Sequence, residues 1–346
     1  MNPLKVYIMG AGCSVCGGYP VANQVREKML DFGRTQLTHD KAKELRRCVD
    51  QTCAWMEHFN VDTIDKLAEK LIKPKDEVVV REAKLAMSAY FFSIEDAGVE
   101  LAHPNYKAFF DELFQYGASH HLEDRIKATP CRVITYNYDR LFERTFIKWA
   151  KDNEPENDDL VENPGSLVKK WLSMGIGSLE RIAFPSDGFS FLKLHGGIGQ
   201  FNRTHSHDRM KHLYWPKLGT KLPEFNDEPY FQKNGRETDT PTIAFPSDKK
   251  RRNMFAPEDS FRAYMDIVEE QAKAFCREAT EIQIIGYSVQ SIDYFTFKAL
   301  IAEAKKCRRV ILRNRVREKD RLMQQLGDLK GELAAEWTVE FRARDF

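Results

Sequence analysis

The stretch KVYIMGAGCSVCGGYP, residues 5–20, decides the fold class of this chain. Its first five residues form a short apolar run of the kind found in a buried strand, and the glycine-rich segment from Gly10 to Pro20 breaks that strand. A helix is predicted to follow over about residues 21–32. A glycine-rich turn between a first strand and a first helix lets the backbone approach a phosphate group. The stretch therefore predicts an α/β fold with a nucleotide-binding loop.

This loop differs from the fingerprint of dinucleotide-dependent dehydrogenases. Gly10-Ala11-Gly12 is followed by Cys13-Ser14-Val15, so the third glycine is missing from its usual place. The next strand candidate lies more than a hundred residues further on, so no compact βαβ unit supplies an acidic residue for a ribose. Hydride transfer is therefore disfavoured.

The remaining chain alternates between two kinds of pattern. Helical spacing of apolar residues recurs over 45–59, 61–71, 78–93 and 106–114, then over 261–277 and 294–306. Strand patterns cover 132–136, 189–194, 242–245, 282–285, 310–312 and 337–341. We expect one domain over 1–346, with a Rossmann-like, mainly parallel sheet built from 1–35 and 125–346. Residues 36–124 are predicted to be an inserted all-helical module, and residues 200–240 an irregular insertion.

The composition is that of an ordinary globular protein. Hydrophobic residues make up 42% and charged residues 30%, and the formal net charge is +1. This near-neutral total gives no field that would attract nucleic acid, and no apolar run is long enough to span a membrane. The seven cysteines are an odd number without framework spacing, as in reduced intracellular proteins. A cytoplasmic location is expected.

Polar residues follow several of the predicted strands. Asn137 and Asp139 come just after the strand that contains Thr135, and His195 follows another. Gly286 and Ser288 end a third strand, and Asn314 ends a fourth. Because the carboxyl ends of parallel strands meet at one edge of a sheet, these residues are predicted to converge on a ligand crevice. Taken singly, each could equally be an ordinary turn or capping residue.

Together these segments resemble the sirtuin (SIR2) superfamily. The first loop matches its first motif in spacing through Gly10, Ala11, Gly12, Ser14, Gly18 and Pro20. Asn137-Tyr138-Asp139 is similar to the family's Asn-x-Asp motif, and His195-Gly196 to its catalytic His-Gly. Gly286-Tyr287-Ser288 and Asn314 resemble later segments that hold the nucleotide. The resemblance covers residues 4–22 and, in patches, about 130–315.

The differences from the lysine deacylases of that superfamily are specific. Those enzymes continue the first motif with Asp-Phe-Arg, whereas Val21-Ala22-Asn23 stands here. They also carry two Cys-x-x-Cys pairs for zinc, whereas Cys276 is the one cysteine between His195 and Gly286. The segments are more similar to the prokaryotic SIR2-like branch, whose members hydrolyse NAD+ in abortive anti-phage defence.

The resemblance implies a role for each matching residue. Asn137 would position a water or the ribose hydroxyls, and His195 would act as general base. Asp139 would bind ribose or orient its neighbours, and a purely structural turn role stays equally open. Gly12 and Ser14 would face the pyrophosphate. The remaining matching residues would hold NAD+: Gly10, Ala11, Gly18, Pro20, Thr135, Gly286, Ser288 and Asn314.

Three classes of function remain open: an NAD+ glycohydrolase, which we favour; an NAD-dependent protein deacylase; and a non-catalytic NAD-sensing or assembly subunit. Family analogy also implies a homo-oligomer and a separate activator or partner, such as a helicase-like ATPase or a short Argonaute. The helical module is the candidate surface for such contacts. A metal site built on Cys13, Cys16, Cys48 and Cys53, or on His205, His207 and His212, is disfavoured, and no metal is expected.

Overall fold

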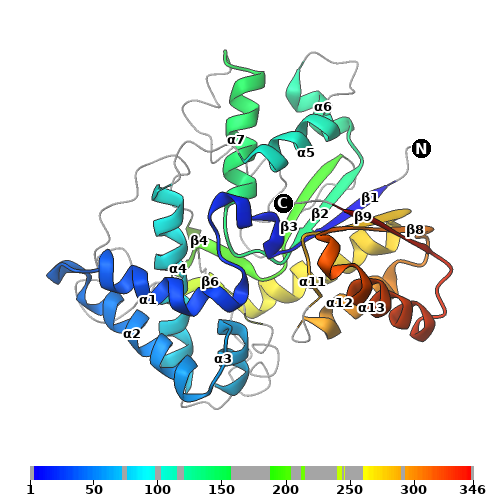
Figure 1. Cartoon of the computed structure of the whole chain (residues 1–346). Helices are drawn as coiled ribbons and strands as arrows, with labels where there is room; N and C mark the ends of the chain where they lie inside the picture. The colour runs from blue at the N-terminus through cyan, green and yellow to red at the C-terminus, as the bar shows by residue number, and fades with distance from the viewer. Residues whose placement is uncertain are drawn as a thin grey trace.

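A six-stranded parallel sheet forms the centre of the molecule (Figure 1). The computed structural model describes residues 4–71, 76–97, 103–114, 121–156, 188–203, 212–214, 240–243, 245, 260–289 and 293–343. In spatial order the strands are β3 (Phe189–Lys193), β2 (Cys131–Thr135), β1 (Lys5–Met9), β7 (Glu281–Ile285), β8 (Arg309–Asn314) and β9 (Thr338–Ala343). The predicted Rossmann-like parallel sheet is confirmed.

The strand order determines where a ligand can enter. From β1 the chain runs outward to β2 and β3, then crosses back to β7 and runs outward the other way to β8 and β9. The order therefore reverses between β1 and β7, which pair in parallel from Lys5↔Glu281 to Met9↔Ile285. In doubly wound sheets, ligands bind outside the carboxyl ends of the strands at this reversal.

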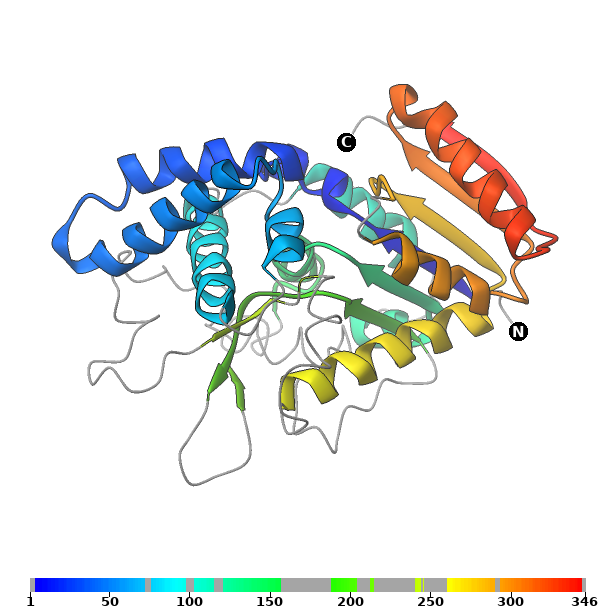
Figure 2. The ribbon, with the colours of Figure 1, turned by 90° about the horizontal axis from the view of Figure 1, so that it is seen from below.

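Helices cover both faces of the sheet, because its inner strands are apolar on both sides. One face packs against α5 (Pro104–Phe114), α6 (Leu122–Ala128) and α7 (Leu141–Asn153). There the Tyr7 and Phe109 rings lie 5.0 Å apart, and the Phe142 and Phe191 rings stack at 4.4 Å. The other face packs against α11 (Ser260–Glu278), α12 (Tyr294–Glu303) and α13 (Lys319–Glu332), which lie in a row in Figure 2.

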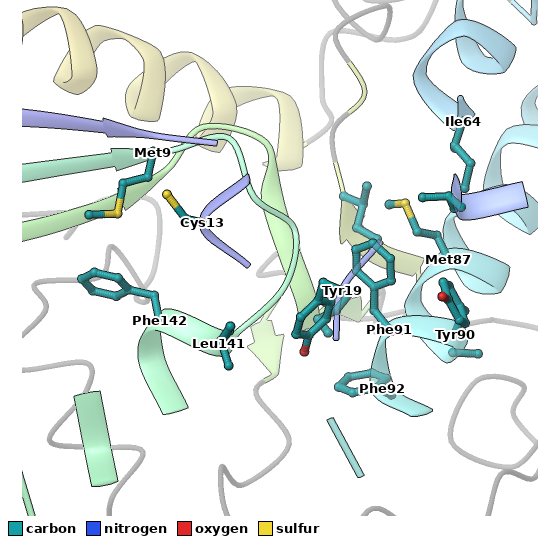
Figure 3. Packing of buried hydrophobic residues seen from close by; sticks show 14 of the residues in the cluster. Met9, Cys13, Tyr19, Ile64, Met87, Tyr90, Phe91, Phe92, Leu141 and Phe142 are labelled. Atoms are coloured by element: carbon teal, nitrogen blue, oxygen red, sulfur yellow. The ribbon is translucent and has the colours of Figure 1, made fainter. Parts of the chain in front are cut away.

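Four further helices pack together beside the sheet: α1 (Val25–Thr35), α2 (Lys43–His58), α3 (Ile64–Lys70) and α4 (Glu77–Ala97). Figure 3 shows the contact of α4 with the first loop, where Tyr19 lies beside Phe91 of α4 with ring centroids 5.5 Å apart. Helix α1 therefore packs with α2 and α4, whereas α5 and α6 pack on the sheet. The domain boundaries at residues 35 and 125 stay predictions.

A second, three-stranded antiparallel sheet corrects one expectation. It orders β5 (His212–Tyr214), β4 (Gly196–Arg203) and β6 (Thr240–Ile243). The range 200–240 was expected to be irregular, but its described residues all lie in these strands. The strand predicted at 242–245 belongs to this small sheet rather than to the parallel one. The glycines at the start of β4 weaken its alternating pattern, which is why the sequence did not reveal it.

Three helices of the core, α6, α7 and α13, were also not predicted from the sequence. None of the helices in the described ranges is long and apolar enough to cross a membrane.

Candidate functional site

A pocket lies at the reversal point of the parallel sheet. The first loop contributes Ala11, Gly12, Ser14 and Pro20; the segment after β2 contributes Asn137 and Asp139; and His195 follows β3. The loop after β7 contributes Gly286 and Ser288, and Asn314 ends β8. The structure thus brings these predicted residues together, although they are up to three hundred positions apart in sequence. Gly10, Gly18 and Thr135 are not among the residues that line the pocket.

The glycines allow two loops to cross at close range. Gly10 N donates to Ile285 O at 3.1 Å, and Gly12 N donates to Gly286 O at 2.8 Å. A Cβ at Gly10 would lie 2.6 Å from Tyr287 Cα, and one at Gly12 would lie 2.6 Å from Gly286 O. Gly286 has φ +57, a conformation that favours glycine. These glycines therefore serve loop packing, and the N–H of Gly12 is already used within the protein.

The first loop does not lead directly into a long helix, in contrast to the sequence prediction. Three short 3₁₀ turns, η1 (Ala11–Cys13), η2 (Val15–Gly17) and η3 (Ala22–Gln24), precede α1, which starts at Val25. Gly18 ends η2 with φ +85, and Pro20 follows at the pocket wall. The loop is therefore a compact wall of the pocket rather than the amino end of a long helix.

Asn137 has one side-chain atom free to meet a ligand. Its Nδ2 donates to Ser14 Oγ at 3.1 Å, and its backbone N donates to Thr135 Oγ1 at 3.0 Å. The side chain is buried, and its Oδ1 has no hydrogen-bond partner among the described residues. Buried polar atoms normally have a partner, so an unpaired oxygen on a pocket wall suits a ligand hydroxyl or a water. Ser14 and Thr135 thus position the Asn137 amide.

Asp139 is held by the protein itself. One carboxylate oxygen accepts from Leu141 N at 3.0 Å, at the start of α7. Burial raises the pKa of the Asp139 carboxyl to about 6, against the positive charge of Lys193, which lowers it. Lys193 in turn forms a fully buried ion pair with Glu143 at 2.7 Å. Of the two roles left open for Asp139, this geometry favours the structural one.

The His195 ring lies in an aromatic and acidic surrounding. The Tyr136 ring meets it edge-on, with centroids 5.2 Å apart, and the Tyr138 ring stacks on it at 5.8 Å. Its Nε2 lies 3.7 Å from Oδ1 of Asp293, the residue that precedes α12. Burial raises the pKa of the Asp293 carboxyl to about 8, and the negative charge of Asp65 adds to this effect. Asp65, on α3, also accepts a hydrogen bond from the Tyr138 hydroxyl at 2.9 Å.

The loops after β7 and β8 hold each other. Asn314 Nδ2 donates to Tyr287 O at 3.1 Å, and Asn314 Oδ1 accepts from Arg315 N at 2.9 Å. Its side chain therefore fixes the Gly286–Ser288 loop rather than offering a free group to a ligand. Ser288 lines the pocket and is partly exposed. Arg315 and Arg317 line the same pocket beside Glu318, whose carboxylate lies 3.8 Å from Arg317.

Sequence reasoning missed the pocket residues Asp65, Asp293, Arg315 and Arg317. Asp293 and Arg315 lie a few positions beyond recognised strand ends, so a wider search after each strand could have found them. Nothing in the sequence signals that Asp65 of the helical region reaches this pocket. Within the described ranges, no three His, Cys, Asp or Glu side chains cluster as metal ligands do.

Comparisons with known proteins are limited to distant structures. No protein-family model matches the chain, and no curated protein is similar to it in sequence. A Sir2 homolog–NAD complex has 14% identity over 95% of this chain and 90% of that one, with a TM-score of 0.42. A mutant Sir2 homologue complexed with 2'-O-acetyl ADP-ribose has 14% identity, covers 97% and 95% of the two chains, and has a TM-score of 0.41. Sir2Tm bound to a propionylated peptide has 13% identity, coverages of 90% and 80%, and a TM-score of 0.34. Similarity at this level assigns neither an activity nor a residue role to this chain.

Proposed function

We propose that this chain is a SIR2-like NAD+ glycohydrolase that breaks the nicotinamide–ribose bond, giving nicotinamide and ADP-ribose. The observation that carries the proposal is the pairing of two groups in one pocket: the unpaired Oδ1 of buried Asn137, and the His195 ring. Both follow neighbouring parallel strands, opposite the glycine loop and at the reversal of the strand order.

Cleavage of the nicotinamide–ribose bond mainly requires the protein to orient the ribose and the attacking water. Nicotinamide leaves as a neutral molecule, and the ribose passes through a state with oxocarbenium character. Asn137 Oδ1 can accept a hydrogen bond from the attacking water or a ribose hydroxyl, and His195 can take the proton. Arg315 and Arg317 line the same pocket and offer a cationic surface to the phosphates.

The motif resemblance also suggests a cellular role for the proposed activity. It makes the chain an NAD-depleting effector of prokaryotic anti-phage defence, acting as a homo-oligomer and with a protein activator or partner. The helical module at 36–124 is the proposed contact surface. Light scattering of the variant Lys43→Glu/Arg46→Glu, changed at two exposed positions of α2, tests this last point, and an unchanged assembly size would count against it.

The activity is tested by following nicotinamide release from NAD+ by chromatography, with and without an acyl-lysine peptide. We expect release without the peptide, and its loss in both Asn137→Ala and His195→Ala. Matched controls are Asn153→Ala at the end of α7 and His58→Ala at the end of α2, both exposed and remote from the pocket. Release that requires the peptide would instead indicate a deacylase. Tight binding of unchanged NAD+ would indicate a sensing or assembly subunit.

A further inference from the structure

Asp293 faces the His195 ring from the start of α12. The distance from His195 Nε2 to Asp293 Oδ1 is 3.7 Å, and the two side chains are 10% and 11% exposed. Asp293 Oδ1 has no hydrogen-bond partner within the described residues. The backbone carbonyl of Asp293 accepts from Phe297 N at 2.9 Å, so the first turn of α12 fixes its position. A buried acid with a free oxygen therefore lies next to the proposed general base.

The aromatic rings around His195 restrict how it can respond. Tyr138 stacks on one side with an interplanar angle of 30°, and Tyr136 packs edge-on at 88°. Tyr136 is itself stacked on Tyr287 at 4.4 Å. The imidazole plane is thus confined. A distance of 3.7 Å exceeds a hydrogen bond, but catalytic hydrogen bonds often shorten only when the ligand binds.

The charge on Asp293 depends on what occupies the pocket. Burial raises the pKa of its carboxyl to about 8, with a further rise from Asp65 and an opposing, smaller effect of hydrogen bonding with the Tyr287 hydroxyl. The other titratable groups facing it within the described residues are Tyr136, Tyr287 and His195, and burial keeps both tyrosines neutral by raising their pKa. Asp293 is therefore largely protonated near neutral pH in the empty pocket. A cationic ligand such as the nicotinamide ring of NAD+ favours its ionised form.

We propose that Asp293 is the positioning residue of His195, and that its ionised carboxylate accepts a hydrogen bond from Nε2–H to hold the imidazole with Nδ1 as the base. This rests on the proposed hydrolysis of NAD+. The C–N bond breaks, and its electron pair leaves with nicotinamide. The water oxygen bonds to the ribose carbon, and its proton passes to Nδ1 and then to solvent. Asp293 stays ionised and stabilises the imidazolium.

The interaction between Asp293 and His195 can be detected without catalysis, through the tautomer of the His195 imidazole. A protonated Asp293 donates to Nε2 and selects the Nδ1–H tautomer, whereas an ionised Asp293 selects Nε2–H. Nitrogen-15 NMR of histidine-labelled protein, assigned with His195→Gln, should show His195 changing tautomer between pH 7 and pH 9. Asp293→Asn should abolish the change of tautomer between pH 7 and pH 9, because an amide does not titrate in this range and can either donate to Nε2 or accept from Nε2–H.

The kinetic test compares Asp293→Asn, Asp293→Ala and Asp293→Glu in nicotinamide release. We expect kcat to fall about 100-fold for Asn and Ala, with KM changed less than about 3-fold, and Glu to recover part of the loss. Asp328→Asn on exposed α13 is the matched control. Full kcat in Asp293→Ala, or a change of His195 tautomer between pH 7 and pH 9 that persists in Asp293→Asn, would overturn the proposal. If the wild-type protein releases no nicotinamide, the proposed function fails, whereas the tautomer experiment still decides on the pair.

Discussion

Glu95 of α4 connects the helical region to the segment that follows β2. Its carboxylate accepts from Arg140 Nε at 3.0 Å and from Arg140 Nη2 at 2.6 Å, with both side chains 3% exposed. The backbone oxygen of Glu95 also accepts from Arg144 Nη1 at 2.8 Å. Arg140 directly follows Asp139, so Glu95 connects α4 to the segment that carries Asn137.

Glu95→Gln leaves the Arg140 guanidinium buried without its counter-charge. Breaking a buried ion pair by removing one partner costs about 3–5 kcal/mol. Because the Gln oxygen can still accept one hydrogen bond, we expect about 3 kcal/mol, a large share of a typical stability of about 5–15 kcal/mol. For a chain of this size the corresponding fall in Tm is roughly 4 °C.

Urea unfolding and calorimetry at pH 7 measure this cost against an exposed pair. Arg342 and Glu340 lie 2.7 Å apart, but their side chains are 44% and 43% exposed, so Glu340→Gln should lower the stability far less than Glu95→Gln. The double variant Glu95→Leu/Arg140→Met should recover most of the loss, since no unpaired charge remains. A Glu95→Gln variant as stable as Glu340→Gln would refute this reasoning.

Three further predictions concern the pocket. Burial raises the pKa of the Asp293 carboxyl to about 8, so the folded state holds this proton more tightly than the unfolded state, and this contribution to stability is lost as pH rises from about 4 to 8. Asp293→Asn should therefore gain stability over wild type in urea unfolding at pH 9 but not at pH 4; an equal effect at both would contradict the burial argument. Ser14→Ala removes the hydrogen bond that orients Asn137 and should lower kcat roughly 10-fold with little change in Tm, whereas an unchanged kcat would separate the two residues. Gly12→Ala places a Cβ 2.6 Å from Gly286 O, so we expect Tm to fall by several degrees in a thermal melt, and an unchanged Tm would mean that the loops separate easily.

The sequence was sufficient for the parts of the fold that depend on local pattern. The inner strands β1, β2 and β7 are short buried runs, and burial on both faces implies helices on both faces. The convergence of Asn137, His195 and Gly286 also follows from the sequence, since parallel strands end at one edge.

The sequence pattern does not indicate which helices and loops pack against one another. Periodicity shows that a helix has an apolar face but not which partner covers it, so the sequence does not indicate that α5 packs against β1 through Phe109. For the same reason, the approach of Asp65 and Asp293 to His195 has no sequence signature. The roles of Gly12 and Asn314 also changed, because their hydrogen-bonding groups are used between loops.

The most direct test of the central claim is to follow the fate of NAD+ itself. Proton NMR of NAD+ with the purified protein, and no acylated peptide, reports substrate and both products in one tube. We predict that NAD+ disappears as nicotinamide and ADP-ribose appear in equal amounts, and that His195→Ala leaves NAD+ intact. Intact NAD+ with the wild-type protein, or equal loss with His195→Ala, would contradict the account.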